Sequence, residues 1–114
     1  MRFVLLGLLF ATTAYAQTFI PYLPDIPLPE NAESESVFDF DTDDTHLSQV
    51  MVYAPTSADS VQQFYADTLP QLGWQSAGPN RFVRDADTLT LEPVSTKDGT
   101  SAWRLELKAS INNP

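Results

Sequence analysis

The chain has 114 residues, a formal net charge of −9 at pH 7 and no cysteine. An acidic surface of this strength repels phosphates and anionic lipid headgroups, so we expect no nucleic-acid binding. The absence of cysteine excludes disulfide bonds and a lipid-acylated cysteine. His46 is the only histidine, which argues against a structural zinc site, because such a site needs several nitrogen or sulfur ligands.

Residues 1–16 have the pattern of a secretory signal peptide. Arg2 precedes an apolar run from Phe3 to Phe10, and an A-x-A cleavage site at Ala14–Ala16 lies directly before Gln17. The apolar run is far shorter than the roughly 20 residues of a membrane-spanning helix. We therefore expect cleavage before Gln17, a periplasmic or secreted protein, and no stable membrane insertion afterwards.

Residues 17–36 form a proline-rich arm, which we expect to run extended, near polyproline II. The arm is rich in large apolar side chains, unlike an ordinary disordered tail. Two interpretations follow: the arm packs over its own domain, which we favour, or it binds a partner. The candidate partner-binding residues, on the arm and on the sheet face expected to receive it, are Phe19, Ile20, Tyr22, Leu23, Met51 and Tyr53.

Two strands are predicted after the arm, at 37–41 and 47–54. In the second, Val50 and Val52 point to one side while Met51 and Tyr53 point to the other. Apolar residues on both faces predict a strand that is covered on both sides. We expect a helix on one face and the arm on the other.

The segment from Thr56 to Trp74 has a helical period. Thr56 and Asp59 resemble a capping box at its start, and Gly73 suits the left-handed position after its end. The apolar stripe expected to lie on the sheet comprises Val61, Phe64, Tyr65, Leu69 and Leu72.

Short strands separated by turns are predicted after the helix, at 74–76, 81–84, 88–92 and 102–108. Their apolar and polar residues alternate, as in an antiparallel sheet with one solvated face. The aromatic residues of this half and of the helix are expected in the core. The predicted fold of residues 37–110 is therefore α+β, one helix packed on an antiparallel sheet, in the order β-β-α-β-β-β-β.

Four carboxylates in and around the first predicted hairpin, Asp39, Asp41, Asp43 and Asp44, are weak candidates for a divalent cation. As an EF-hand loop beginning at Asp39, the segment has Asp44 where glycine is required and Val50 where a bidentate glutamate is required. We therefore expect a solvated acidic hairpin with no metal. Asp43 and Asp44 could raise the pKa of His46.

Catalytic chemistry is not predicted. The sequence has no G-x-S-x-G setting and no glycine-rich phosphate loop, and a small domain with one helix rarely builds a cleft. We expect no catalytic residue and no cofactor.

Several motifs together resemble a group of small exported proteobacterial proteins, mainly from alphaproteobacteria. The matching stretches are Pro27–Ala32 (PLPENA), Phe64–Tyr65 (FY), Thr68–Trp74 (TLPQLGW), Arg81–Arg84 (RFVR) and Leu89–Leu91 (LTL). The resemblance implies a signal peptide, a proline-rich leader, one helix and antiparallel strands. It implies no activity, cofactor or catalytic residue. Asp43-Asp44 departs from the Gly-Arg that these proteins often carry in the first hairpin turn.

These observations favour a non-catalytic periplasmic domain that binds an envelope protein or serves as an accessory subunit. The alternative is a small periplasmic protein that binds a ligand or divalent cation through its acidic hairpin.

Overall fold

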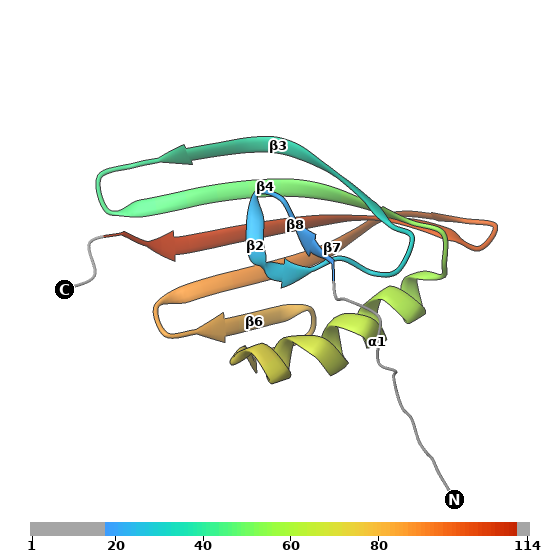
Figure 1. Cartoon of the computed structure of the whole chain (residues 1–114). Helices are drawn as coiled ribbons and strands as arrows, with labels where there is room; N and C mark the ends of the chain where they lie inside the picture. The colour runs from blue at the N-terminus through green and yellow to red at the C-terminus, as the bar shows by residue number, and fades with distance from the viewer. Residues whose placement is uncertain (1–17, 112–114) are drawn as a thin grey trace, which may run out of the picture.

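The computed structural model describes residues 18–111. Its main element is a six-stranded antiparallel sheet in the order β3-β4-β8-β7-β6-β5, and a separate two-stranded sheet is formed by β1 and β2 (Figure 1). The elements are β1 (Phe19–Ile20), β2 (Leu23–Pro27), β3 (Glu33–Asp41), β4 (Thr45–Ala54), α1 (Ala58–Thr68), the 3-10 turn η2 (Leu69–Leu72), β5 (Gln75–Ser76), β6 (Arg81–Arg84), β7 (Asp87–Lys97) and β8 (Thr100–Ser110).

The predicted α+β class and the order of helix and strands are confirmed. One helix packs on the antiparallel sheet, and in chain order it lies between the β3–β4 hairpin and the later strands. β3 begins at Glu33, four residues before the predicted start, and β7 and β8 are longer than predicted. The turn between β7 and β8 has positive φ at Asp98 and Gly99, which matches the right-handed twist of a tight hairpin.

The N-cap of helix α1 lies one residue after the predicted cap, Thr56. Ser57 is the N-cap, in an extended conformation, and its hydroxyl accepts a 3.1 Å hydrogen bond from the backbone N–H of Ser60. Gly73 ends η2 with φ of 94°, the left-handed conformation expected there. Of the predicted apolar stripe, Val61, Tyr65 and Leu69 are buried, Phe64 is half-buried and Leu72 is exposed.

The proline-rich arm forms a β-hairpin, so the expectation of a polyproline II conformation without ladder pairing is wrong. Pro21 lies in the turn between β1 and β2, and Pro27 lies at the end of β2. The two strands pair only with each other, which leaves free strand edges where proline is tolerated.

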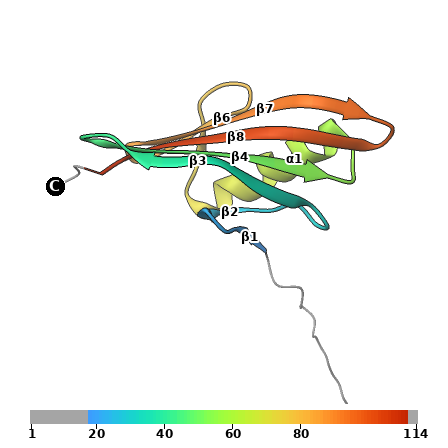
Figure 2. The ribbon, with the colours of Figure 1, turned by 90° about the horizontal axis from the view of Figure 1, so that it is seen from above.

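The arm packs in cis, as favoured, but on the opposite side of the sheet from the one expected. Both views place the β1–β2 hairpin and α1 on the same side of the large sheet (Figures 1 and 2). The physical reason is the length of the helix. Eleven helical residues span about 16 Å, whereas strands of ten or eleven residues span about 35 Å. The helix alone leaves part of the apolar face uncovered, and the hairpin fills that part.

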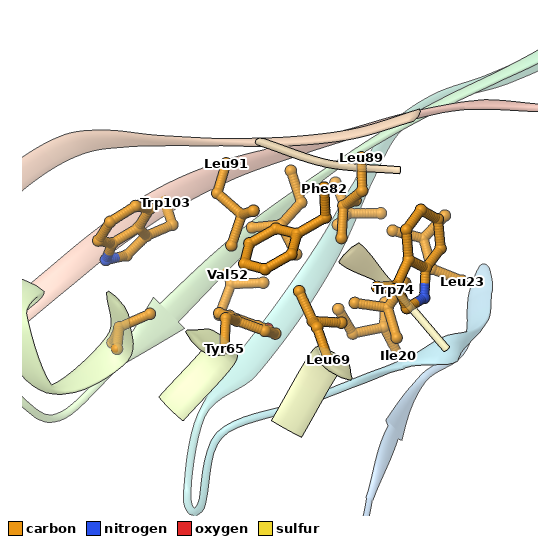
Figure 3. Packing of buried hydrophobic residues seen from close by; sticks show 14 of the residues in the cluster. Ile20, Leu23, Val52, Tyr65, Leu69, Trp74, Phe82, Leu89, Leu91 and Trp103 are labelled. Atoms are coloured by element: carbon orange, nitrogen blue, oxygen red, sulfur yellow. The ribbon is translucent and has the colours of Figure 1, made fainter. Parts of the chain in front are cut away.

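The core therefore lies between the large sheet on one side and the helix together with the arm on the other. Ile20, Leu23 and Ile26 of the arm belong to the same buried cluster as Leu69 and Trp74 (Figure 3). The remaining members of this buried cluster are Val50, Val52, Ala54, Val61, Tyr65, Phe82, Leu89, Leu91, Trp103 and Leu105. The predicted core placement of the later aromatic residues is thus confirmed.

Arg84 joins the arm to the end of the helix and to β6. Its guanidinium lies 4.6 Å from the ring centroid of Trp74, donates a 3.1 Å hydrogen bond to the carbonyl oxygen of Leu72, and forms a 3.0 Å ion pair with Asp25 of β2. Arg84 thus combines a cation–π contact with an ion pair. Together these contacts hold the β1–β2 hairpin against the end of the helix.

Candidate interaction surface

The arm residues that were candidates for partner binding divide into two pairs. Ile20 and Leu23 are each only 1% exposed, and both lie in the core, so they are not accessible to a partner. Phe19 and Tyr22 remain 39% and 56% exposed. The alternation along the hairpin therefore places one pair against the sheet and leaves the other pair at the surface.

Met51 and Tyr53 lie on the sheet face away from the helix. Tyr53 is 44% exposed and Met51 is half-buried, whereas their neighbours Val50 and Val52 are completely buried on the helix side. The prediction that β4 is covered on both sides is wrong. The arm was the expected cover, and it is engaged with the helix instead.

A β-bulge extends this apolar surface onto β3. The register of β3 against β4 shifts between Ser36 and Phe38, so one residue, Val37, is inserted. Side chains of β3 beyond the bulge consequently change faces. Phe38 is placed opposite Gln49, and Phe40 opposite Leu47, on the same face as Met51.

We define the open face as Phe38, Phe40, Leu47, Met51 and Tyr53. No described element between residues 18 and 111 covers it, and its most exposed members are Phe40 at 48% and Tyr53 at 44%. The rings of Phe38 and Phe40 lie 5.4 Å apart in a tilted arrangement. Phe40 and Tyr53 are exposed and the other three are half-buried. Large apolar side chains gathered on a solvent-facing sheet face are typical of an interaction surface.

Polar groups border the open face. The hydroxyl of Tyr53 donates a 3.1 Å hydrogen bond to a carboxylate oxygen of Glu35, which raises the pKa of Tyr53. On the next strand, Arg104 lies opposite Met51 and forms a 2.5 Å hydrogen-bonded ion pair with Glu92 of β7. The rim therefore contains both charges, as is common around an apolar interaction patch.

His46 is held between two aspartates on the other face of the same hairpin. Its Nε2 lies 2.6 Å from Oδ1 of Asp39, and its Nδ1 makes a short contact with Oδ1 of Asp41. The hydrogen bond to Asp41 raises the pKa of His46 most, the charges of both aspartates raise it further, and partial burial opposes them. A carboxylate only accepts hydrogen bonds, so both contacts are hydrogen bonds when both ring nitrogens carry a proton, which is the form that the raised pKa favours.

The partners of His46 differ from those predicted. Asp43 and Asp44 lie in the turn, where Asp44 accepts a 2.9 Å hydrogen bond from the hydroxyl of Thr45. Asp41 lies directly opposite His46 in the β3–β4 ladder, and Asp39 lies on the same face of β3. The pairing of Asp41 with His46 depends on the register of the β3–β4 turn. Counting back from a known turn would have found it, but the sequence does not reveal the turn register.

The four aspartates considered for a cation are thus split between the strand and the turn. Within the described range 18–111, no group of three or more potential ligands is arranged to hold a metal ion. In that same range, no helix is long and apolar enough to cross a membrane.

Polar side chains bridge a groove between α1 and the turn before β6. The groove is lined by Gln62, Asn80 and Phe82 among others, and the side-chain amide of Gln62 donates a 2.7 Å hydrogen bond to Oδ1 of Asn80. This one hydrogen bond joins the two sides of the groove.

Comparison with known proteins finds no matching family model, no similar curated protein and no similar solved structure. The fold is a small α+β domain with a sheet face that no element within residues 18–111 covers, and the function is inferred from that surface.

Proposed function

We propose that this chain is an exported, non-catalytic domain that binds a protein partner of the cell envelope through the open face. The observation that carries the proposal is the set of five large apolar side chains on a sheet face that no described element covers. Antiparallel sheets usually turn polar residues toward water on such a face. On that face β7 and β8 carry mostly polar residues, whereas β3 and β4 place the five apolar side chains there beside Glu33, Glu35 and Gln49.

Export is supported by the signal-peptide pattern of residues 1–16, which lie outside the described residues. A non-catalytic role is supported by the state of His46, because aspartates engage both of its ring nitrogens and leave neither available as a base. The same contact disfavours the cation-binding alternative, since His46 occupies the carboxylates of Asp39 and Asp41.

The experiment compares three baits in pull-downs from envelope extract. They are the wild-type protein, the open-face variant Phe40→Ser/Tyr53→Ser, and the control Leu72→Gln, which changes an apolar residue that is 37% exposed at the end of η2. We expect a partner that wild type and control retain and the open-face variant loses. Capture of the same proteins by all three folded baits would contradict the proposal.

A further inference from the structure

β3 is an edge strand. It is the terminal strand in the order β3-β4-β8-β7-β6-β5, and within residues 18–111 only β4 pairs with it. Figure 1 shows β3 along the upper margin of the sheet, and the β1–β2 hairpin lies over the middle of the sheet instead of along this margin. The outer side of β3 therefore presents backbone N–H and C=O groups that a further strand could pair with.

The chain carries its charges very unevenly. Residues 18–80 contain ten aspartates and glutamates and neither lysine nor arginine. Residues 81–114 contain five acidic and five basic residues and are neutral overall. The negative charge of the protein is thus concentrated in the half that includes β3, β4 and α1.

Four of those carboxylates lie on β3 itself, on both faces. By register, Glu33 and Glu35 share the face of Tyr53 and Met51, whereas Asp39 and Asp41 lie on the helix side because the bulge changes the alternation. Asp39 and Asp41 are already engaged by His46. The segment before the bulge, Glu33–Ser36, pairs regularly with β4. Among residues 18–111, no lysine or arginine forms an ion pair with Glu33 or Glu35.

A second copy of the chain is a poor occupant of this edge. Pairing β3 with its own copy would bring carboxylates of both chains together, and like charges across a strand pair are destabilising. A basic strand from a different protein would instead be attracted to this edge, because each lysine or arginine beside Glu33 or Glu35 would gain a cross-strand ion pair.

We propose that the outer edge of β3, at Glu33–Ser36, accepts an extended segment of a protein partner in which lysine or arginine alternates with apolar residues. The added strand continues the sheet, and its basic residues meet Glu33 and Glu35, which themselves lie opposite Tyr53 and Met51 of the open face. Its apolar residues alternate onto the other face of the sheet, on the side of Ser34 and Ser36. This inference rests on the proposed function, since it names the kind of segment that the partner presents.

The test uses the mature protein and a synthetic seven-residue peptide that alternates lysine with valine. One control peptide has N-methyl groups on alternate residues. The other has glutamate in place of lysine. Binding is followed by the shifts of backbone amide resonances. We expect the basic peptide to bind with the largest shifts in β3, and both control peptides to bind at least about tenfold more weakly, because one lacks the backbone donors and the other repels the edge.

The matched protein variants are Glu33→Gln/Glu35→Gln on the edge and Glu92→Gln/Glu106→Gln on β7 and β8. Glutamine at position 35 keeps an oxygen that can accept from Tyr53, so the edge remains intact. The edge variant should weaken binding about threefold to tenfold, and the control pair less than twofold.

Three results would overturn the inference: no binding at millimolar peptide, equal binding of the N-methylated peptide, or a wild-type dimer in sedimentation whose concentration-dependent amide shifts map to β3. The proposed function has a separate readout. Capture of a partner that depends on Phe40 and Tyr53, together with an edge that takes no basic strand, would leave the proposed function standing and reject only this inference.

Discussion

The hydroxyl of Tyr65 on α1 donates a 2.8 Å hydrogen bond to the carbonyl oxygen of Pro27, 38 residues earlier in the chain. Tyr65 is buried, and burial raises its pKa, so its hydroxyl stays protonated and acts as a donor. This bond makes the proline-rich arm a part of the folded domain.

We predict that Tyr65→Phe lowers the free energy of unfolding by about 1–3 kcal/mol, because it leaves the buried carbonyl oxygen of Pro27 without its donor. Urea denaturation measures the change. Tyr53→Phe, which removes an exposed hydroxyl, is the control and should change stability by less than about 0.5 kcal/mol. Equal effects of the two substitutions would show that the contact between the arm and the helix does not form.

Two adjacent arm residues test the side on which the arm packs. Leu23→Ala should lower the free energy of unfolding by about 2–5 kcal/mol, because it leaves a cavity in the core. Tyr22→Ala, one residue earlier and 56% exposed, should lower it by about 0.5 kcal/mol or less. Denaturation midpoints of the two variants give the comparison. Small effects from both would mean that the hairpin is not docked in solution.

His46 should make the stability of the β3–β4 hairpin depend on pH. Its pKa is raised in the folded protein, so the protonated form is favoured there, and the groups facing it are Asp39 and Asp41, with Ala109 beside it on β8. The stabilisation is complete below the unfolded-state pKa of about 6.5 and is lost as the pH rises through the higher folded-state value.

The measurement is the denaturation midpoint of wild type and His46→Gln at several pH values from about 5.5 to about 9. Wild type should lose stability across the upper part of this range, and the variant should lose less. A titration of the His46 ring by NMR locates the transition directly. A ring that titrates at or below its ordinary value would contradict the structure at this contact.

Processing gives a prediction from the sequence alone. The exported protein should begin at Gln17, because Ala14–Ala16 forms the cleavage site. Intact mass of the protein recovered from the periplasm measures this, and cyclisation of Gln17 would appear as the loss of one ammonia. Retention of Met1, or cleavage beyond Pro21, would reject the prediction.

The sequence predicted well those elements that depend on neighbours in the chain. The helix follows from the spacing of Val61, Tyr65 and Leu69, which recurs every four residues. The later strands follow from alternation, as at Leu89 and Leu91, and the β7–β8 turn from Asp98-Gly99. Each of these signals lies within about ten residues, so local chemistry suffices to recognise it.

The candidate surface was recognised only in part. Met51 and Tyr53 were singled out because the alternation of β4 places them away from the helix, and that placement is correct. Alternation places Phe38 and Phe40 on a common face of the strand, but the bulge at Val37 decides which face it is. One inserted residue reverses the direction of every side chain beyond it, and an alternating pattern of apolar residues does not reveal the insertion.

By itself, the sequence determined the α+β class, the order of helix and strands, and the acidic character of the protein, because these depend on composition and short-range periodicity. Only the tertiary structure decided where the arm lies and which carboxylates hold His46. Ile20 and Leu23 could bury themselves on either face of the sheet, and the choice depends on how much of one face an eleven-residue helix leaves uncovered. That is a relation between segments distant in the chain, so no local pattern contains it.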